Sequence, residues 1–222
     1  MTVTEFATLH FTSAPSLNEV RGALSSAIRA QDSWHAANFP DLPSSISDRA
    51  VALFEQIDDP TQILITTKWD SVEAHLQWIR SEQNTKIMTG LAAHIIPKDT
   101  VLFHVNGIIF GDSAGTSVPL LQAPVISVSR FFIPREERGS FEAKFGEVKG
   151  VLDKYVSPGS LRFGWREDLE EGAKEEEFVV VCGWETVESH SEFTNAAGFS
   201  QFQEIEQFIA QVDRKHYRRF SL

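Results

Sequence analysis

The sequence predicts an α+β fold of two tandem ferredoxin-like βαββαβ units, packed sheet to sheet as a pseudo-dimeric α/β barrel. The first reason is a repeated stretch: Trp69–His75 reads WDSVEAH and returns 115 residues later as Trp184–His190, WETVESH, with four of seven positions identical. A period of this length is typical of duplicated domains rather than a solenoid. The second reason is that strand and helix patterns follow the same order in both halves. The third is that each such sheet would expose an apolar face unless another sheet covered it.

In the first half, hydrophobic periodicity predicts four strands and two helices. The strand at Glu5–Thr12 alternates, with Ala7 and Leu9 on one face and Phe6 and His10 on the other. The expected order is a strand at 5–12, a helix at 17–39, strands at 50–56 and 62–69 forming a hairpin, a helix from 70 to about 94, and a strand at 100–110.

The repeated stretch forms the corner between the third strand and the second helix. Asp70 directly precedes the helical pattern and is expected to cap it, and Glu73 follows three residues later, the spacing of a capping box. The same corner is expected to begin at Trp184 in the second half.

The second half repeats the order of the first. The expected elements are a strand at 125–133, a helix at 135–156, strands at 161–166 and 177–184, a helix at 187–209 and a strand at 212–220. Between the halves, residues 113–123 contain glycine, proline and serine and predict a linker. The predicted domains are therefore 1–112 and 124–222, and association of the pseudo-dimer into a further homodimer stays open.

The charge of the chain argues against a nucleic-acid partner. The net charge is −11, whereas phosphate binding needs a concentrated basic surface. The one basic cluster, residues 214–219, is interpreted as a solvated strand end. No apolar stretch reaches the roughly 18 residues that a membrane span requires, and no secretory signal precedes the first strand. We therefore expect a cytoplasmic protein with no membrane partner, in which the single cysteine, Cys182, is a small buried hydrophobe.

Paired βαββαβ units, each with Trp-Asp/Glu-Ser/Thr-Val-Glu-x-His at the corner, resemble the dimeric α/β-barrel superfamily. The resemblance is to antibiotic-biosynthesis-monooxygenase-like proteins in tandem-domain form, of the type associated with fungal secondary metabolism, and it covers nearly the whole chain. It implies a fold, but not one reaction, because members include cofactor-independent monooxygenases, polyketide cyclases, haem-handling enzymes and stress proteins.

Simple cofactor motifs are absent from the sequence. It has no phosphate-cradling glycine loop, no Gly-x-Gly-x-x-Gly, no Cys-x-x-Cys and no His-Glu-x-x-His. We therefore expect no cofactor and no metal. Haem stays open as an alternative, because a single histidine can serve as its proximal ligand.

The repeated Trp69 and His75 can be interpreted in two ways. They could line a pocket between helix and sheet as substrate contacts, or they could close the corner by packing and a hydrogen bond. Their recurrence as Trp184 and His190 favours the structural interpretation, because a duplicated protein needs only one working site.

Positions at which the halves differ are better candidates for chemistry. The sequence alignment places His10 opposite Arg130, and His104 opposite His216. First and fourth strands are neighbours in a ferredoxin-like sheet, so His10 is expected to approach His104, and Arg130 to approach His216. Such an imidazole pair would supply a near-neutral acid and base. The alternative is isolated strand histidines satisfied by backbone or water.

His10 and His104 are therefore the predicted catalytic residues. The predicted substrate contacts are Trp34, His35, Trp69, His75, Trp78, Arg130 and His216. The expected function is a cofactor-independent tailoring enzyme that monooxygenates an activated ring of a hydrophobic polyketide- or terpenoid-like molecule. The alternatives are an aldol or pericyclic cyclase in the same pocket and a non-catalytic small-molecule-binding or stress-response module.

Overall fold

The computed structural model describes residues 1–14, 18–46, 48–107, 110, 120–157 and 159–222. The chain divides into two compact units, which we describe separately: unit 1 comprises residues 1–108 and 219–222, and unit 2 comprises residues 109–218. The predicted linker, 113–123, lies mostly outside the described residues, and its end forms a short 3-10 turn, Leu120–Gln122.

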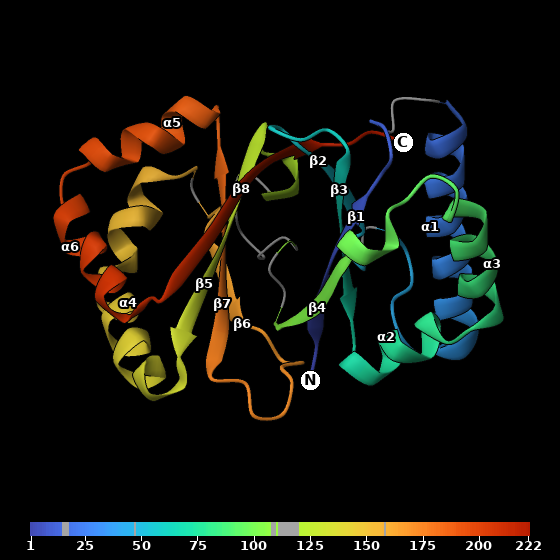
Figure 1. Ribbon diagram of the computed structural model, residues 1–222, viewed down its shortest axis with the longest axis horizontal. Helices are drawn as coiled ribbons and strands as arrows, with labels where there is room; N and C mark the ends of the chain where they lie inside the picture. The colour runs from blue at the N-terminus through green and yellow to red at the C-terminus, as the bar shows by residue number, and fades with distance from the viewer. Residues whose placement is uncertain (15–17, 47, 108–109, 111–119, 158) are drawn as a thin grey trace. The chain divides into compact units, whose positions relative to one another are not determined.

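Unit 1 has the predicted βαββαβ order, and its helices cover one face of its sheet (Figure 1). The strands lie in the order β4-β1-β3-β2, and each neighbouring pair is antiparallel. The elements are β1 (Val3–His10), α1 (Asn18–Asn38), β2 (Ala52–Gln56), β3 (Gln62–Trp69), α2 (Val72–Ile79), α3 (Glu82–Leu91), the 3-10 helix η1 (Pro97–Asp99) and β4 (Val101–Asn106).

Unit 2 repeats this order, with antiparallel strands in the order β8-β5-β7-β6. Its elements are β5 (Val125–Pro134), η3 (Arg135–Glu137), α4 (Arg138–Tyr155), β6 (Arg162–Trp165), β7 (Glu175–Trp184), α5 (Val187–Glu192), η4 (Phe193–Asn195), α6 (Phe199–Gln203), η5 (Glu204–Phe208) and β8 (Gln211–Arg219). The predicted α+β class with two βαββαβ units is thus confirmed.

The chain end departs from the predicted domain limits. Residues 219–222 belong to unit 1, where the Phe220 backbone N–H donates to the Leu53 carbonyl at 2.9 Å. The Phe220 side chain is buried in the unit-1 core beside Leu9 and Leu24. The last residues therefore complete the first core and not the second.

The second helix of each unit is interrupted, where the sequence predicts one continuous helix. In unit 1, the Ser81 hydroxyl accepts the Asn84 backbone N–H and starts α3 as a new helix. The cap of α2 also differs from the prediction, because the Ser71 hydroxyl, not Asp70, accepts the Ala74 backbone N–H. Serine and threonine are favoured caps, and Thr186 has the same role in unit 2.

An aromatic cluster fills the space between the unit-2 sheet and α4. Phe141, fully buried, lies 5.1 Å from Phe178 and 5.9 Å from Trp165 between ring centroids, both edge to face. This geometry is the favoured one for aromatic pairs. Among the described residues, no helix combines the length and the apolar character needed to cross a membrane.

Gly183 leaves no room for a larger side chain. A Cβ at this position of β7 would lie 2.9 Å from Ala123 Cβ and 3.0 Å from Ser160 Cβ. Gly183→Ala is therefore expected to lower the free energy of unfolding by about 1–3 kcal/mol, the usual cost of overpacking, as measured by chemical denaturation.

Gly146→Ala is the matched control, because a Cβ at this position of α4 meets nothing within 4 Å. Alanine is the better helix former, so this variant should gain roughly 0.5–1 kcal/mol. Equal stabilities of the two variants would contradict the packing argument.

Candidate functional site

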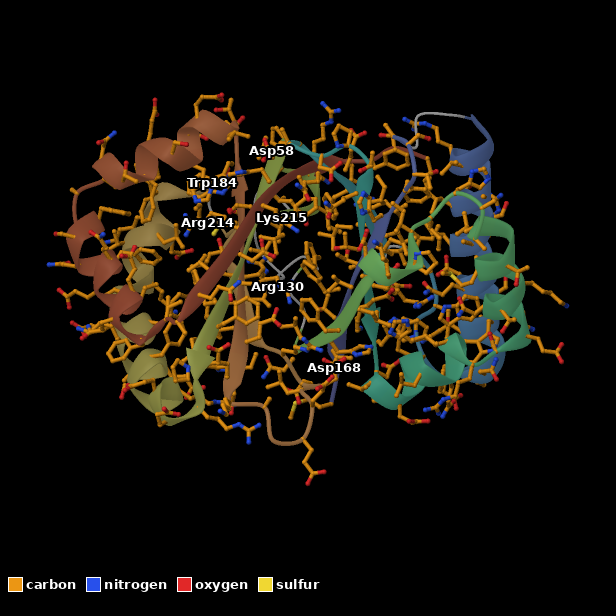
Figure 2. All side chains as sticks on the ribbon, viewed as in Figure 1. Asp58, Arg130, Asp168, Trp184, Arg214 and Lys215 are labelled. Carbon is orange, nitrogen blue, oxygen red and sulfur yellow. The ribbon has the colours of Figure 1, made fainter. Side chains whose placement is uncertain are left out.

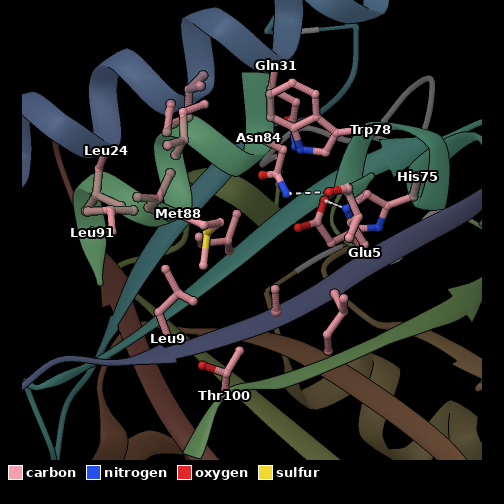
Figure 3. Close-up of a pocket in the computed structure, with 18 residues that line it drawn as sticks. Glu5, Leu9, Leu24, Gln31, His75, Trp78, Asn84, Met88, Leu91 and Thr100 are labelled. Carbon is pink, nitrogen blue, oxygen red and sulfur yellow. Dashed lines mark hydrogen bonds and ion pairs between the residues drawn. The ribbon is translucent and has the colours of Figure 1, made fainter. Parts of the chain in front are cut away.

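A cavity of about 240 Å³ lies between the unit-1 sheet and its helices. Figure 3 shows that one end is polar, with Glu5, His75 and Asn84 beside Trp78, while Leu9 and Met88 lie toward the other end. The lining residues are Glu5, Ala7, Leu9, Leu24, Ala27, Ile28, Gln31, Leu53, Ile65, His75, Trp78, Ile79, Asn84, Ile87, Met88, Leu91, Thr100 and Leu102. An apolar pocket with a few convergent polar groups is the usual form of a small-molecule site.

A pair of imidazole rings defines the polar end. His75 Nδ1 lies 2.7 Å from His104 Nε2 in a buried hydrogen bond. The His75 ring also stacks on Trp69, with 4.6 Å between centroids and 16° between planes. The repeated corner on β3 and α2 is thereby joined to β4. His75 faces the cavity, and His104 lies directly behind it.

Glu5 on β1 completes this group. Its carboxylate Oε2 accepts the Trp69 indole N–H at 2.8 Å and lies 3.4 Å from His75 Nε2. The side chain is only 6% exposed, and among the described residues its Oε1 accepts no hydrogen bond. A buried carboxylate of this kind can remove a proton from a molecule in the cavity.

Sequence reasoning missed Glu5. The signal was present, because the alternation that places Ala7 and Leu9 on the helix-facing side of β1 places Glu5 there as well. A carboxylate at an inward position of an otherwise buried strand is rare unless it is paired or functional.

The predicted approach of His10 to His104 is wrong. In the β1–β4 register, the residue opposite His104 is Glu5, five positions before His10. His10 also occupies the opposite face of the sheet, since strand side chains alternate. Its Nδ1 lies 3.1 Å from Asp99 Oδ2 in an exposed pair, so the structure brings His104 together with His75 instead.

Three predicted substrate contacts, Trp34, His35 and Trp69, do not line the cavity, and the first two pack elsewhere. Trp34 packs on Trp78 at 5.6 Å and on Phe39 at 5.9 Å between centroids. His35 is 1% exposed, and its Nδ1 hydrogen bonds with the Ser44 hydroxyl at 3.0 Å. Both therefore have packing roles, and of the predicted contacts in unit 1 only His75 and Trp78 line the cavity.

Trp69 is held from a further direction by Arg49. The Arg49 guanidinium lies over the Trp69 ring at 4.6 Å and pairs with Asp32 at 2.7 Å. Burial lowers the pKa of Arg49, and the Asp32 carboxylate opposes that shift. This fixes the indole whose N–H binds Glu5.

Unit 2 repeats the histidine pair. His190 Nδ1 lies 2.8 Å from His216 Nε2, and the His190 ring stacks on Trp184 at 4.3 Å and 13°. The Trp184 indole N–H donates to the Ser127 hydroxyl at 2.9 Å. These residues line a second cavity, of about 330 Å³. The predicted contact His216 therefore does face a cavity, in unit 2.

The two cavities differ in charge at equivalent positions. Val3 lies opposite Trp69 and Val125 opposite Trp184, so Ser127 of unit 2 takes the place of Glu5. By the same register, Leu102 of unit 1 corresponds to the cavity-lining Arg214 of unit 2, because they lie opposite Ala7 and Ser129. Arg214 belongs to the basic cluster interpreted as a solvated strand end; it is exposed, and it also lines this cavity.

Arg130 lines neither of these two cavities. The register makes it equivalent to Thr8 and not to His10, and Figure 2 shows it on the side of β5 away from Trp184 and Arg214. Its guanidinium pairs with Glu177 at 2.5 Å. The predicted approach of Arg130 to His216 is therefore wrong.

Burial shifts the pKa of two unit-2 residues. It lowers the pKa of His190 to about 3, with further lowering by Arg214 and His216. It raises the pKa of the Cys182 thiol to about 12, so Cys182 is the predicted inert hydrophobe. Within the described residues, no cluster of three His, Cys, Asp or Glu side chains could hold a metal ion.

The whole chain shares its fold with solved proteins of low sequence identity. An anthrone oxidase-like protein aligns with a TM-score of 0.63 and 8% identity over 99% of this chain and 92% of the other. A candidate monooxygenase from Fusobacterium nucleatum aligns at 0.60 and 8% over 99% and 93%. A heme-binding protein from Thermus thermophilus aligns at 0.52 and 9% over 100% and 92%.

No protein-family model matches the sequence, and no curated protein matches it. The likeness to solved structures shows the fold and leaves the reaction to the residues of the cavities.

The depressed pKa of His190 predicts acid sensitivity. Between pH 6.5 and about 3 the unfolded chain binds a proton at this residue that the folded chain excludes. The free energy of unfolding is therefore expected to fall as the pH drops through this window, by at most about 1.4 kcal/mol per pH unit from His190. Denaturation at a series of pH values measures the slope.

His190→Asn is expected to make that slope shallower. His94→Asn controls for the loss of one histidine as such. A slope that His190→Asn leaves unchanged would disprove the assignment of acid sensitivity to His190.

Proposed function

We propose that the unit-1 cavity is the active site of a cofactor-independent monooxygenase that acts on an activated ring of a hydrophobic small molecule. One observation carries the proposal: the Glu5 carboxylate, supported by the His75–His104 pair, stands at the polar end of an otherwise apolar cavity. This arrangement suits removal of a proton from an apolar substrate whose anion is stabilised by its own ring.

The histidine pair positions Glu5 for this step. When His104 Nε2–H donates to His75 Nδ1, the remaining proton of the His75 ring lies on Nε2, facing Glu5 Oε2. Oε2 then receives two N–H groups, one from His75 and one from Trp69. Oε1 is left to accept the proton of the substrate.

The oxygenation that follows needs only dioxygen as a second substrate. The substrate anion passes one electron to O2, and the substrate radical and superoxide combine to a peroxide anion at the ring carbon. The proton that Glu5 removed returns to this anion and gives a hydroperoxide. Loss of water then leaves a ketone. For anthrone, one oxygen atom enters the ring carbon, the other leaves as water, and two hydrogens are removed from that carbon. The apolar walls exclude bulk water from the anion.

The name of one protein that shares this fold, anthrone oxidase-like, suggests a probe substrate for the test. Anthrone is apolar, has three fused rings and carries an acidic ring CH2 group.

Haem does not fit the cavities as they stand. Their volumes are about 240 and 330 Å³, one below and one near the lower end of the ~300–1,000 Å³ of ordinary ligand pockets. In addition, Nε2 of His75, the ring nitrogen left for a ligand once Nδ1 bonds to His104, faces the Glu5 carboxylate at 3.4 Å. A porphyrin would require these walls to move, so we derive no step through it.

Glu5→Gln is expected to lower kcat/KM for anthrone oxidation by about 100-fold or more, the range for loss of a general base. The variant keeps the shape of the side chain and its capacity to bind the Trp69 indole. Oxygen uptake and anthraquinone absorbance, recorded together, measure the rate and the one-to-one stoichiometry.

His10→Ala is the matched control, because His10 lies on the other face of the sheet, and its rate is expected to equal the parental rate. Undiminished substrate conversion without oxygen would contradict the oxygenase proposal and favour a cyclase. Anthrone binding without conversion under air would favour a binding module. Full activity of Glu5→Gln would overturn the site assignment.

A further inference from the structure

The unit-2 cavity has a charge that the proposed function does not use. Arg214 on β8 lines it, and Figure 2 shows Arg214 on the same side of the unit-2 sheet as Trp184. Its Nε–H donates to the Ser129 hydroxyl at 3.0 Å. In the part of the chain that the structure describes, the terminal nitrogens of this guanidinium have neither a hydrogen bond nor an ion pair.

The other polar groups of the cavity are satisfied within the protein. His190 and His216 bond to each other, and the Ser127 hydroxyl accepts the Trp184 indole N–H. Glu206 also lines the cavity and is exposed. It accepts a hydrogen bond from Gln203 at 3.3 Å and attracts Arg214 electrostatically without a hydrogen bond to it. Arg214 is therefore the polar group that the cavity offers to a ligand.

The rest of the lining is largely aromatic and aliphatic, with Phe131, Phe193, Phe199, Phe202 and Ile205 among its members. A guanidinium presents two parallel N–H groups that match the two oxygens of a carboxylate. Arg214 is an exposed residue, so a bound carboxylate can keep contact with water, which limits the desolvation cost.

We infer that the unit-2 cavity is a second ligand site, which binds an apolar carboxylate through Arg214 and places the ring system of that ligand against the phenylalanines. The unit-1 cavity has the opposite charge: Leu102 replaces Arg214 there, and the Glu5 carboxylate would repel an anion. The two repeats thus keep one scaffold and select ligands of different charge. This inference does not depend on the reaction proposed for unit 1.

The test compares 1-naphthoate with naphthalene-1-carboxamide, which has the same rings and no charge. Calorimetric titration of the full chain is expected to show at least about 10-fold tighter binding of the acid, as a charge-assisted bidentate contact provides. The indole N–H signal of Trp184 in a heteronuclear NMR spectrum should shift with both ligands, since Trp184 lines the cavity.

Arg214→Leu, which copies the unit-1 residue, should weaken 1-naphthoate binding roughly 10- to 100-fold and leave the carboxamide affinity unchanged. Arg218→Leu removes the same charge from the same strand outside the cavity lining and is the control, with parental affinity expected. Arg214→Lys should give an intermediate affinity, because an ammonium keeps the charge but not the fork geometry.

The inference would be overturned if the parental chain bound acid and amide with equal affinity, or bound neither. It would also be overturned if Arg214→Leu left the affinity for 1-naphthoate unchanged. NMR shifts induced by 1-naphthoate only in unit 1 would overturn it as well. The preference of the parental chain for acid over amide tests it even if Arg214→Leu fails to fold.

Discussion

A hydrogen bond between two imidazole rings joins the strand-helix corner to the last strand in each unit. One ring of each pair stacks on the corner tryptophan, so that three aromatic side chains from three elements hold one another in place. This constraint fixes which side of β4 and β8 faces the helices. It also sets the floor of both cavities, since His75 and His190 line them.

Both cavities contain the corner histidine, but the charged residues around it differ between the two units. In unit 1 the corner indole donates to Glu5, and in unit 2 it donates to Ser127. Unit 1 therefore holds a carboxylate next to a histidine pair, whereas unit 2 holds a histidine pair next to Arg214. Duplication preserved the packing motif, and two positions on neighbouring strands account for the difference in charge.

The sequence correctly predicted the features that depend on local periodicity. The periodicity of apolar residues predicted the βαββαβ order and the burial of Cys182. The return of one seven-residue stretch after 115 residues predicted the repeat. It also predicted that His104 and His216 occupy equivalent positions, and the strand registers agree. The predicted pairing of His10 with His104 is wrong because the sequence does not give the register between neighbouring strands. A shift of one strand along the other changes both the opposing residue and the face on which it lies.

By itself, the sequence determined that the chain is a duplicated α+β protein with a Trp-x-x-x-x-x-His corner in each half, because patterning within a strand or helix is a local property. Only the tertiary structure decided that the corner histidine meets a histidine from the last strand, that Glu5 rather than His10 faces the first cavity, and that Arg214 faces the second. The hydrogen bonds that hold these residues join positions 26 to 85 apart. They therefore depend on strand pairing and helix packing, which no short stretch of the sequence contains.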